Sequence, residues 1–186
     1  MNKKGFTLVE VMVVVVIIAI LGAFGFASLS SGGAKLRGAV RELSSNFQAL
    51  KAEAVKRNVD TKIKIDTASN KYEMWIDVGV DNWWPDFNAS DIPLGSGGTG
   101  KVEMESSIEI ISTTIAAHTF GYTPFGLTHP LVSANPPTGG NTDYEVRLKY
   151  ANADPAKEKY LGVRLSLVGS PTVIRSTNGG VTWERF

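Results

Sequence analysis

Two histidines are the side chains best suited to acid–base or metal chemistry, and their setting supports neither. His118 and His129 stand eleven residues apart, without an H-E-x-x-H pattern and without a cysteine to complete a zinc site. His118 lies in a predicted strand, where a packed or edge histidine is commoner than a ligand. The glycine-rich segment 95–100 lacks the Gly-Lys-Ser/Thr of a phosphate loop, so a flexible loop explains it better. The sequence therefore predicts no enzyme, no metal centre and no cofactor.

Oxygen ligands for a hard cation gather in one polar segment. They are Asp77, Asp81, Asn82, Asp86, Asn88 and Asp91. Of these, Asp81, Asp86 and Asp91 are the candidates for a weak Ca²⁺ site, although their spacing is not that of an EF-hand. Asp and Asn also favour turns by themselves, so a long surface loop over 79–101 is the main interpretation and calcium the alternative.

Two adjacent tryptophans occupy the same predicted loop. Trp83 and Trp84 cannot both face one way, so one of them is a candidate contact for a partner protein, since exposed Trp is a favoured anchor. The alternative is that the loop folds back and buries both.

Arginines near the C-terminus are the candidates for DNA contacts. The candidates are Arg164, Arg175 and Arg185, together with Lys149, and Trp183 is available for stacking on a base. Glu145, Glu158 and Glu184 interrupt this basic track, and the net charge of the chain is only +1. DNA binding is therefore the minority interpretation.

The longest apolar stretch stands at the N-terminus. Residues 8–27 hold a single charged side chain, Glu10, and twenty helical residues cover about 30 Å, the thickness of the hydrocarbon core of a bilayer. No A-x-A cleavage site follows, as a secretory signal would require. A carboxylate inside a membrane costs about 2.5–3.5 kcal/mol at the helix centre and less near its end, so its retention implies a partner.

The segment from Lys3 to Glu10, KKGFTLVE, resembles the class III signal of type IV pilins and type II secretion pseudopilins. The resemblance implies that a prepilin peptidase cuts between Gly5 and Phe6, that Phe6 is N-methylated, and that Glu10 is retained for assembly. In the filament, Glu10 would pair with the amino group of a neighbouring subunit's Phe6. Lys3 and Lys4 precede the apolar segment, so the positive-inside rule places this end in the cytoplasm. We expect a single-pass inner-membrane protein with a periplasmic domain.

The rest of the 186-residue chain is long enough for one small domain. A stripe of apolar residues at helical spacing predicts an amphipathic helix that ends near Asn58. It comprises Leu36, Val40, Leu43, Phe47, Leu50 and Ala54. A period of two then predicts strands, including hairpins over 61–78 and 172–186. The expected fold is α+β, with a long N-terminal helix packed on an antiparallel β-sheet domain. The expected boundaries are 1–5 leader, 6–33 transmembrane helix, 34–59 amphipathic helix and 60–186 β domain.

Three shorter motifs resemble the GspH/FimT branch of minor pseudopilins: residues 52–58, 120–126 and 162–166. Many members of this branch have a Gly-Arg-hydrophobic-Arg motif in the last hairpin. Residues 169–175 occupy that position here and lack the first arginine. The resemblance implies a minor pseudopilin of a type II secretion system, with other pilins and the prepilin peptidase as partners. The alternative is a minor pilin of a type IV pilus that contributes to DNA binding and uptake.

Overall fold

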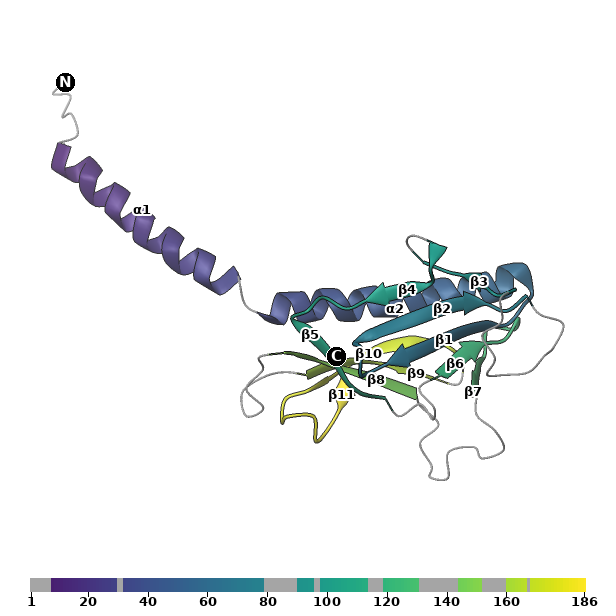
Figure 1. Cartoon of the computed structure of the whole chain (residues 1–186). Coiled ribbons are helices and arrows are strands. Elements are labelled where there is room, and N and C mark those ends of the chain that lie inside the picture. The colour runs from purple at the N-terminus through teal and green to yellow at the C-terminus, as the bar shows by residue number, and fades with distance from the viewer. Residues whose placement is uncertain are drawn as a thin grey trace, which may run out of the picture.

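Two helices lead into two antiparallel sheets in the computed structural model of the chain (Figure 1). The structure describes residues 8–29, 32–78, 90–95, 98–113, 119–130, 144–151, 160–166 and 168–186. The helices are α1 (Leu8–Leu29) and α2 (Gly32–Arg57). The sequence predicts one continuous, softened helix here, whereas the structure has two separate helices, the second beginning on a pair of glycines, which are poor helix formers.

The amphipathic stripe of α2 is confirmed. All six predicted apolar residues are buried, each with at most 2% of its surface exposed. The predicted helix end is confirmed as well, because Asn58 takes a left-handed conformation with φ 55°. The Val59 N–H then donates to the Ala54 carbonyl at 3.2 Å, which satisfies one of the carbonyls that a helix end leaves open.

The first sheet has the strand order β3-β2-β1-β6-β7, with β4 also paired to β2. Its strands are β1 (Thr61–Asp66), β2 (Lys71–Ile76), β3 (Ile92–Pro93), β4 (Lys101–Glu103), β6 (Thr119–Tyr122) and β7 (Thr128–Pro130). The predicted β1–β2 hairpin is confirmed. Strands β3 and β7 lie in segments that the sequence predicts as loops. Strands of two or three residues are too short to show a period of two, so the sequence does not reveal them.

The second sheet has the order β11-β10-β9-β8-β5. Its strands are β5 (Ile108–Thr113), β8 (Tyr144–Tyr150), β9 (Tyr160–Leu165), β10 (Pro171–Ser176) and β11 (Glu184–Arg185). A register shift interrupts the β5–β8 pairing between Ile110 and Ser112. The single β domain expected from the alternation is thus built from two sheets.

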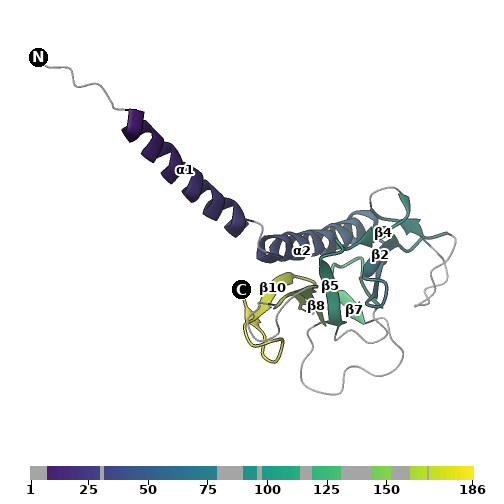
Figure 2. The same cartoon turned by 60° about the vertical axis from the view of Figure 1, so that its left-hand side comes forward.

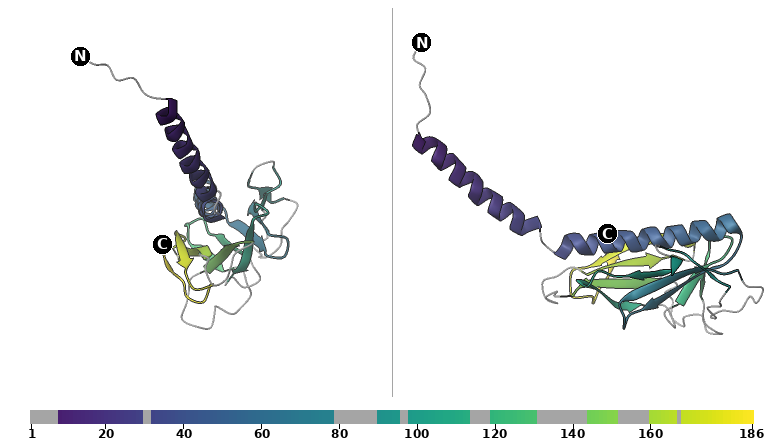
Figure 3. Two further views of the ribbon diagram at one scale, coloured as in Figure 1. Left: turned by 90° about the vertical axis from the view of Figure 1, so that its left-hand side faces the viewer. Right: turned by 45° about the horizontal axis from the view of Figure 1, so that its top comes forward.

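Helix α2 lies along both sheets and joins them in one core (Figure 3). The ring of Phe47 meets Phe120 of the first sheet edge to face, with 5.2 Å between ring centroids. Phe120 in turn stacks on Tyr144 of the second sheet at 6.3 Å. Each buried aromatic ring removes a large apolar area from water, and such ring pairs add about 0.5–1.5 kcal/mol beyond that area.

Asn70 links the two sheets at the turn between β1 and β2. Its φ of 55° is left-handed, a region that Asn tolerates better than most residues. The side-chain Nδ2 donates to the Ile108 carbonyl, and Oδ1 accepts from the Ile110 N–H at 2.8 Å. One side chain therefore fixes the end of the first hairpin to strand β5.

We expect Asn70→Gly to lower the free energy of unfolding by about 1–3 kcal/mol, because glycine keeps the conformation and leaves the Ile110 N–H without its acceptor. Asn70→Ala should cost about 1–2 kcal/mol more, since alanine is strained at positive φ. Equilibrium urea unfolding of the purified chain measures both. A Gly variant as stable as the unaltered chain would show that this link contributes nothing.

Candidate assembly site

Helix α1 presents apolar side chains to the outside. It extends away from the two sheets, whereas α2 lies against them (Figure 2). All side chains of residues 8–20 are exposed, from Leu8 at 76% to Ile17 at 50%. The apolar residues of α2 are buried in the core of the domain. The domain does not cover the apolar side chains of α1 in the same way. Such a surface requires lipid or neighbouring helices.

Glu10 lies in the first turn of α1. There the unsatisfied N–H groups of the helix favour a negative charge. A shallow hollow of about 260 Å³ runs beside it, lined by Val9, Met12, Val13, Val16 and Ile17. Gly5 and Phe6, the predicted cleavage and methylation residues, lie outside the described residues, so their roles and that of Glu10 stay predictions.

The predicted transmembrane segment, residues 6–33, contains α1. Among the residues whose side chains the structure describes, which in α1 are 8–20, no helix is long and apolar enough to cross a membrane.

A buried charge cluster lies in the first sheet. Lys62 of β1 is 1% exposed, and its Nζ is 3.0 Å from Asp77 Oδ2 and 3.3 Å from Asp91 Oδ2. The side chain of Asp77 is 8% exposed and that of Asp91 fully buried. Alternation along β1 would place Lys62 and Lys64 in solvent, but only Lys64 is exposed. The feature of the sequence that could have indicated this cluster is the pair Asp77 and Asp91, which stand on either side of residues 79–89.

This cluster gives Asp91 a structural partner that the calcium interpretation did not include. Within the described part of the chain, no group of three or more His, Cys, Asp or Glu residues could hold a metal ion. Asp81 and Asp86 lie outside the described residues, as do Trp83, Trp84 and His118. The calcium site and the tryptophan contact therefore stay predictions.

Acidic partners accompany the candidate DNA-binding side chains. Arg164 is 2.7 Å from one oxygen of the buried Glu145, and Arg147 is 2.8 Å from the other. Arg175 pairs with Glu184 at 2.9 Å. A hydrogen bond from Lys149 to Glu109 raises the pKa of the lysine.

The structure brings two of these arginines together. Arg164 and Arg185 share a hollow of about 260 Å³ with Ser166, Thr172 and Ile174. The interleaved carboxylates leave no continuous basic track along these strands, which a nucleic-acid backbone would need. The structure therefore adds no support to the DNA interpretation.

The comparisons with known proteins fit this arrangement. The sequence family described as the prokaryotic N-terminal methylation motif matches residues 1–26. This motif implies a membrane-anchored, pilin-like protein. No curated protein sequence matches the chain.

Solved structures share the fold at low identity. The minor pseudopilin EpsH of the type 2 secretion system of Vibrio cholerae has a TM-score of 0.51 at 10% identity, over 78% of this chain and 98% of EpsH. A second EpsH structure gives 0.51 at 10% over 82% and 100%. The type IV minor pilin FimU of Pseudomonas aeruginosa gives 0.48 at 12% over 81% and 93%.

The chain thus combines an N-terminal methylation motif over residues 1–26 with a fold similar to that of a minor pseudopilin. The predicted fold class, a long N-terminal helix with an antiparallel β domain, is confirmed.

Proposed function

We propose that the chain is a minor pseudopilin, a structural subunit of the pseudopilus of a type II secretion system. The observation that carries the proposal is the exposure of the apolar side chains over residues 8–20 of α1, whereas the apolar stripe of α2 is buried in the core. Lipid covers these side chains before assembly, and the helices of neighbouring subunits cover them afterwards. The fold likeness to EpsH, a minor pseudopilin of a type 2 secretion system, supports the proposal.

In this proposal, α1 anchors the chain in the inner membrane, with the N-terminus in the cytoplasm and the β domain in the periplasm. Prepilin peptidase removes residues 1–5 and leaves a methylated Phe6 as the first residue. The new amino group of Phe6 on one subunit then meets the Glu10 carboxylate of its neighbour. In an apolar filament core this pair fixes the offset between subunits, because any other offset leaves a buried charge uncompensated.

N-terminal sequencing tests the processing step. We expect the chain to begin with N-methyl-Phe6 when it is produced with a prepilin peptidase, and with Met1 in the same host without the enzyme. The physical reason is that the leader carries Lys3 and Lys4, whose charges keep the cleavage site at the cytoplasmic membrane surface. A chain that begins at Met1 in both hosts would contradict the proposal.

Deleting the gene in its own host distinguishes the two machines. Loss of protein secretion with normal surface pili supports a pseudopilus. Loss of pili or of DNA uptake with normal secretion would assign the chain to a type IV pilus instead.

A further inference from the structure

Exposed apolar side chains gather at the end of α2 that is far from α1. They are Val55 (52% exposed), Phe125 (86%), Leu127 (47%) and Val168 (58%), called here the end patch. Single exposed apolar residues are normal on a protein surface. These four differ because they lie on three segments that meet: the last turns of α2, the 123–127 turn after β6, and residues 168–170 after β9.

Close approaches at two glycines bring the three segments together. A Cβ on Gly126 would stand 2.9 Å from Lys51 Cε and 3.3 Å from Val55 Cγ2. A Cβ on Gly169 would stand 2.6 Å from the Gly126 carbonyl oxygen. Both glycines also have positive φ, 72° and 71°, so no other residue suits these positions well. The end patch is therefore one continuous surface.

Hydrogen bonds hold both turns in place. The Thr123 N–H donates to Leu127 O at 2.9 Å and the Gly126 N–H to Thr123 O at 2.8 Å. In the other turn, the Gly169 N–H donates to Ser166 O at 2.8 Å. The apolar side chains are thus presented on an ordered frame, which lowers the entropy cost of binding a partner.

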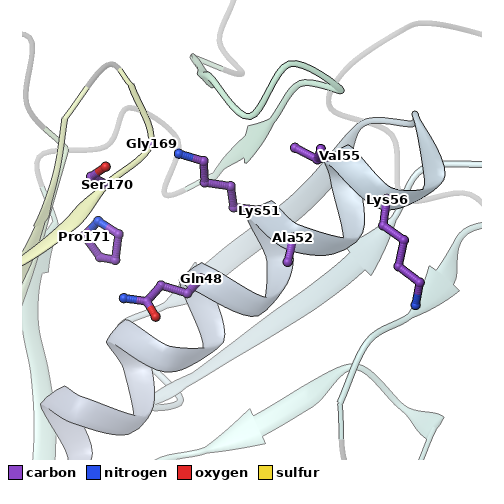
Figure 4. A pocket seen from close by; sticks show the side chains of 8 residues that line it. All are labelled: Gln48, Lys51, Ala52, Val55, Lys56, Gly169, Ser170 and Pro171. Atoms are coloured by element: carbon purple, nitrogen blue, oxygen red, sulfur yellow. The ribbon is translucent and has the colours of Figure 1, made fainter.

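A hollow of about 590 Å³ adjoins the end patch. It is lined by Gln48, Lys51, Ala52, Val55, Lys56 and the segment 169–171. Figure 4 shows Gln48 and Lys51 pointing from α2 toward that segment. The Lys51 ammonium donates to the Val168 carbonyl at 2.7 Å, which uses one of its three N–H groups.

The charges around the hollow indicate what it accepts. Lys51, Lys56 and Arg57 bring three positive charges to this end of α2, where the Glu53 carboxylate lies 3.3 Å from Lys56 and 2.6 Å from Arg57. A partner that covers the hollow removes water from these cations, which is costly unless it supplies acceptors. A second copy that docked the same patch face to face would oppose one basic rim to another.

We propose that the end patch docks a different pilin-like subunit, through an apolar side chain flanked by carboxylates. This inference rests on the proposed function, because a chain anchored by α1 presents the opposite end of α2 away from the membrane (Figure 1). There it meets the next subunit along the filament. The apolar side chain seats against Phe125 and Val55, and the carboxylates pair with Lys51 and Lys56.

Photo-crosslinking in the native host tests the proposal. Benzoylphenylalanine replaces Phe125 in the full chain, and a matched variant carries it at Val181, which is 79% exposed on the turn before β11. We expect position 125 to crosslink to a different protein that carries an N-terminal methylation motif, and position 181 not to do so. No adduct from position 125 in assembled filaments would overturn the proposal. An adduct with a second copy or with a non-pilin protein would also overturn it.

Substitutions test the two parts of the surface separately. Phe125→Asp should lower filament incorporation about tenfold or more, and Lys56→Glu by a smaller factor, because an apolar anchor contributes more than a rim charge. Val181→Asp is the control and should incorporate normally, and circular dichroism checks that all three fold. If Phe125→Asp incorporates normally, the docking role of the end patch is refuted, and the proposed function is not affected. Failure of the unaltered chain to incorporate would refute the proposed function and the inference with it.

Discussion

Replacing Lys62 by methionine is expected to lower the free energy of unfolding by about 3–5 kcal/mol, which is the usual cost of breaking a buried ion pair. The Lys62 ammonium is 1% exposed and lies 3.0 Å from Asp77 and 3.3 Å from Asp91. Methionine keeps the length of the side chain but leaves two buried carboxylates without this cation. Since domains are stable by only about 5–15 kcal/mol, the variant should be near the limit of folding.

Urea unfolding of the purified full chain at neutral pH, followed by circular dichroism, measures this change. Lys64→Met is the matched control, because Lys64 is exposed on the same strand. It should change the stability by less than about 0.5 kcal/mol. Adding Asp77→Asn and Asp91→Asn to Lys62→Met should recover part of the loss, because two buried negative charges are then removed. A loss below about 1 kcal/mol in the single variant would show that water solvates the cluster.

Glu10→Gln is expected to reduce incorporation into the filament by about tenfold or more while leaving the chain inserted in the membrane. The substitution keeps the shape of the side chain and removes the charge that is proposed to pair with the Phe6 amino group of a neighbour. Breaking such a pair inside an apolar core costs about 3–5 kcal/mol, and each 1.4 kcal/mol is a factor of ten in an equilibrium. Removing a charge from an apolar helix does not hinder insertion.

The measurement is the ratio of filament to membrane protein after shearing and fractionation of cells. Glu10→Ala should behave as Glu10→Gln, and Glu10→Asp should retain part of the incorporation, because it keeps a carboxylate. Val11→Ala is the control for a neighbouring apolar position on α1. If Glu10→Gln assembles normally, the pairing is refuted. If it is lost from the membrane, the residue acts on insertion instead.

Local periodicity was enough to predict α2 and the main strands. The stripe from Leu36 to Ala54 recurs at three and four residues, and only one face of a helix can bury it. The alternation of apolar and polar residues in Thr61–Asp66 and Tyr144–Tyr150 correctly predicts strands, because alternate side chains of a strand face opposite sides of the sheet. Strands β3 and β7 were missed, because their pairing depends on neighbours distant in sequence rather than on their own residues.

The partners of the charged residues could not be predicted from local sequence patterns. The sequence makes Asp91 a candidate calcium ligand, and simple alternation would place Lys62 on the solvent face of its strand, yet the fold buries the two against each other. Arg164 is a candidate DNA contact from sequence, and the fold pairs it with Glu145 on the neighbouring strand. In each case the partner is nineteen or more residues away along the chain, so its position is decided by the pairing of strands.

The sequence by itself determined the prepilin-type N-terminus, the amphipathic helix and the α+β class, because each is encoded in contiguous residues. Only the tertiary structure decided the division into two sheets, the burial of Lys62 between two aspartates, and the meeting of Val55, Phe125 and Val168 at one end of α2. These features depend on how distant segments pack. Their energies come from contacts that exist only after the chain has folded.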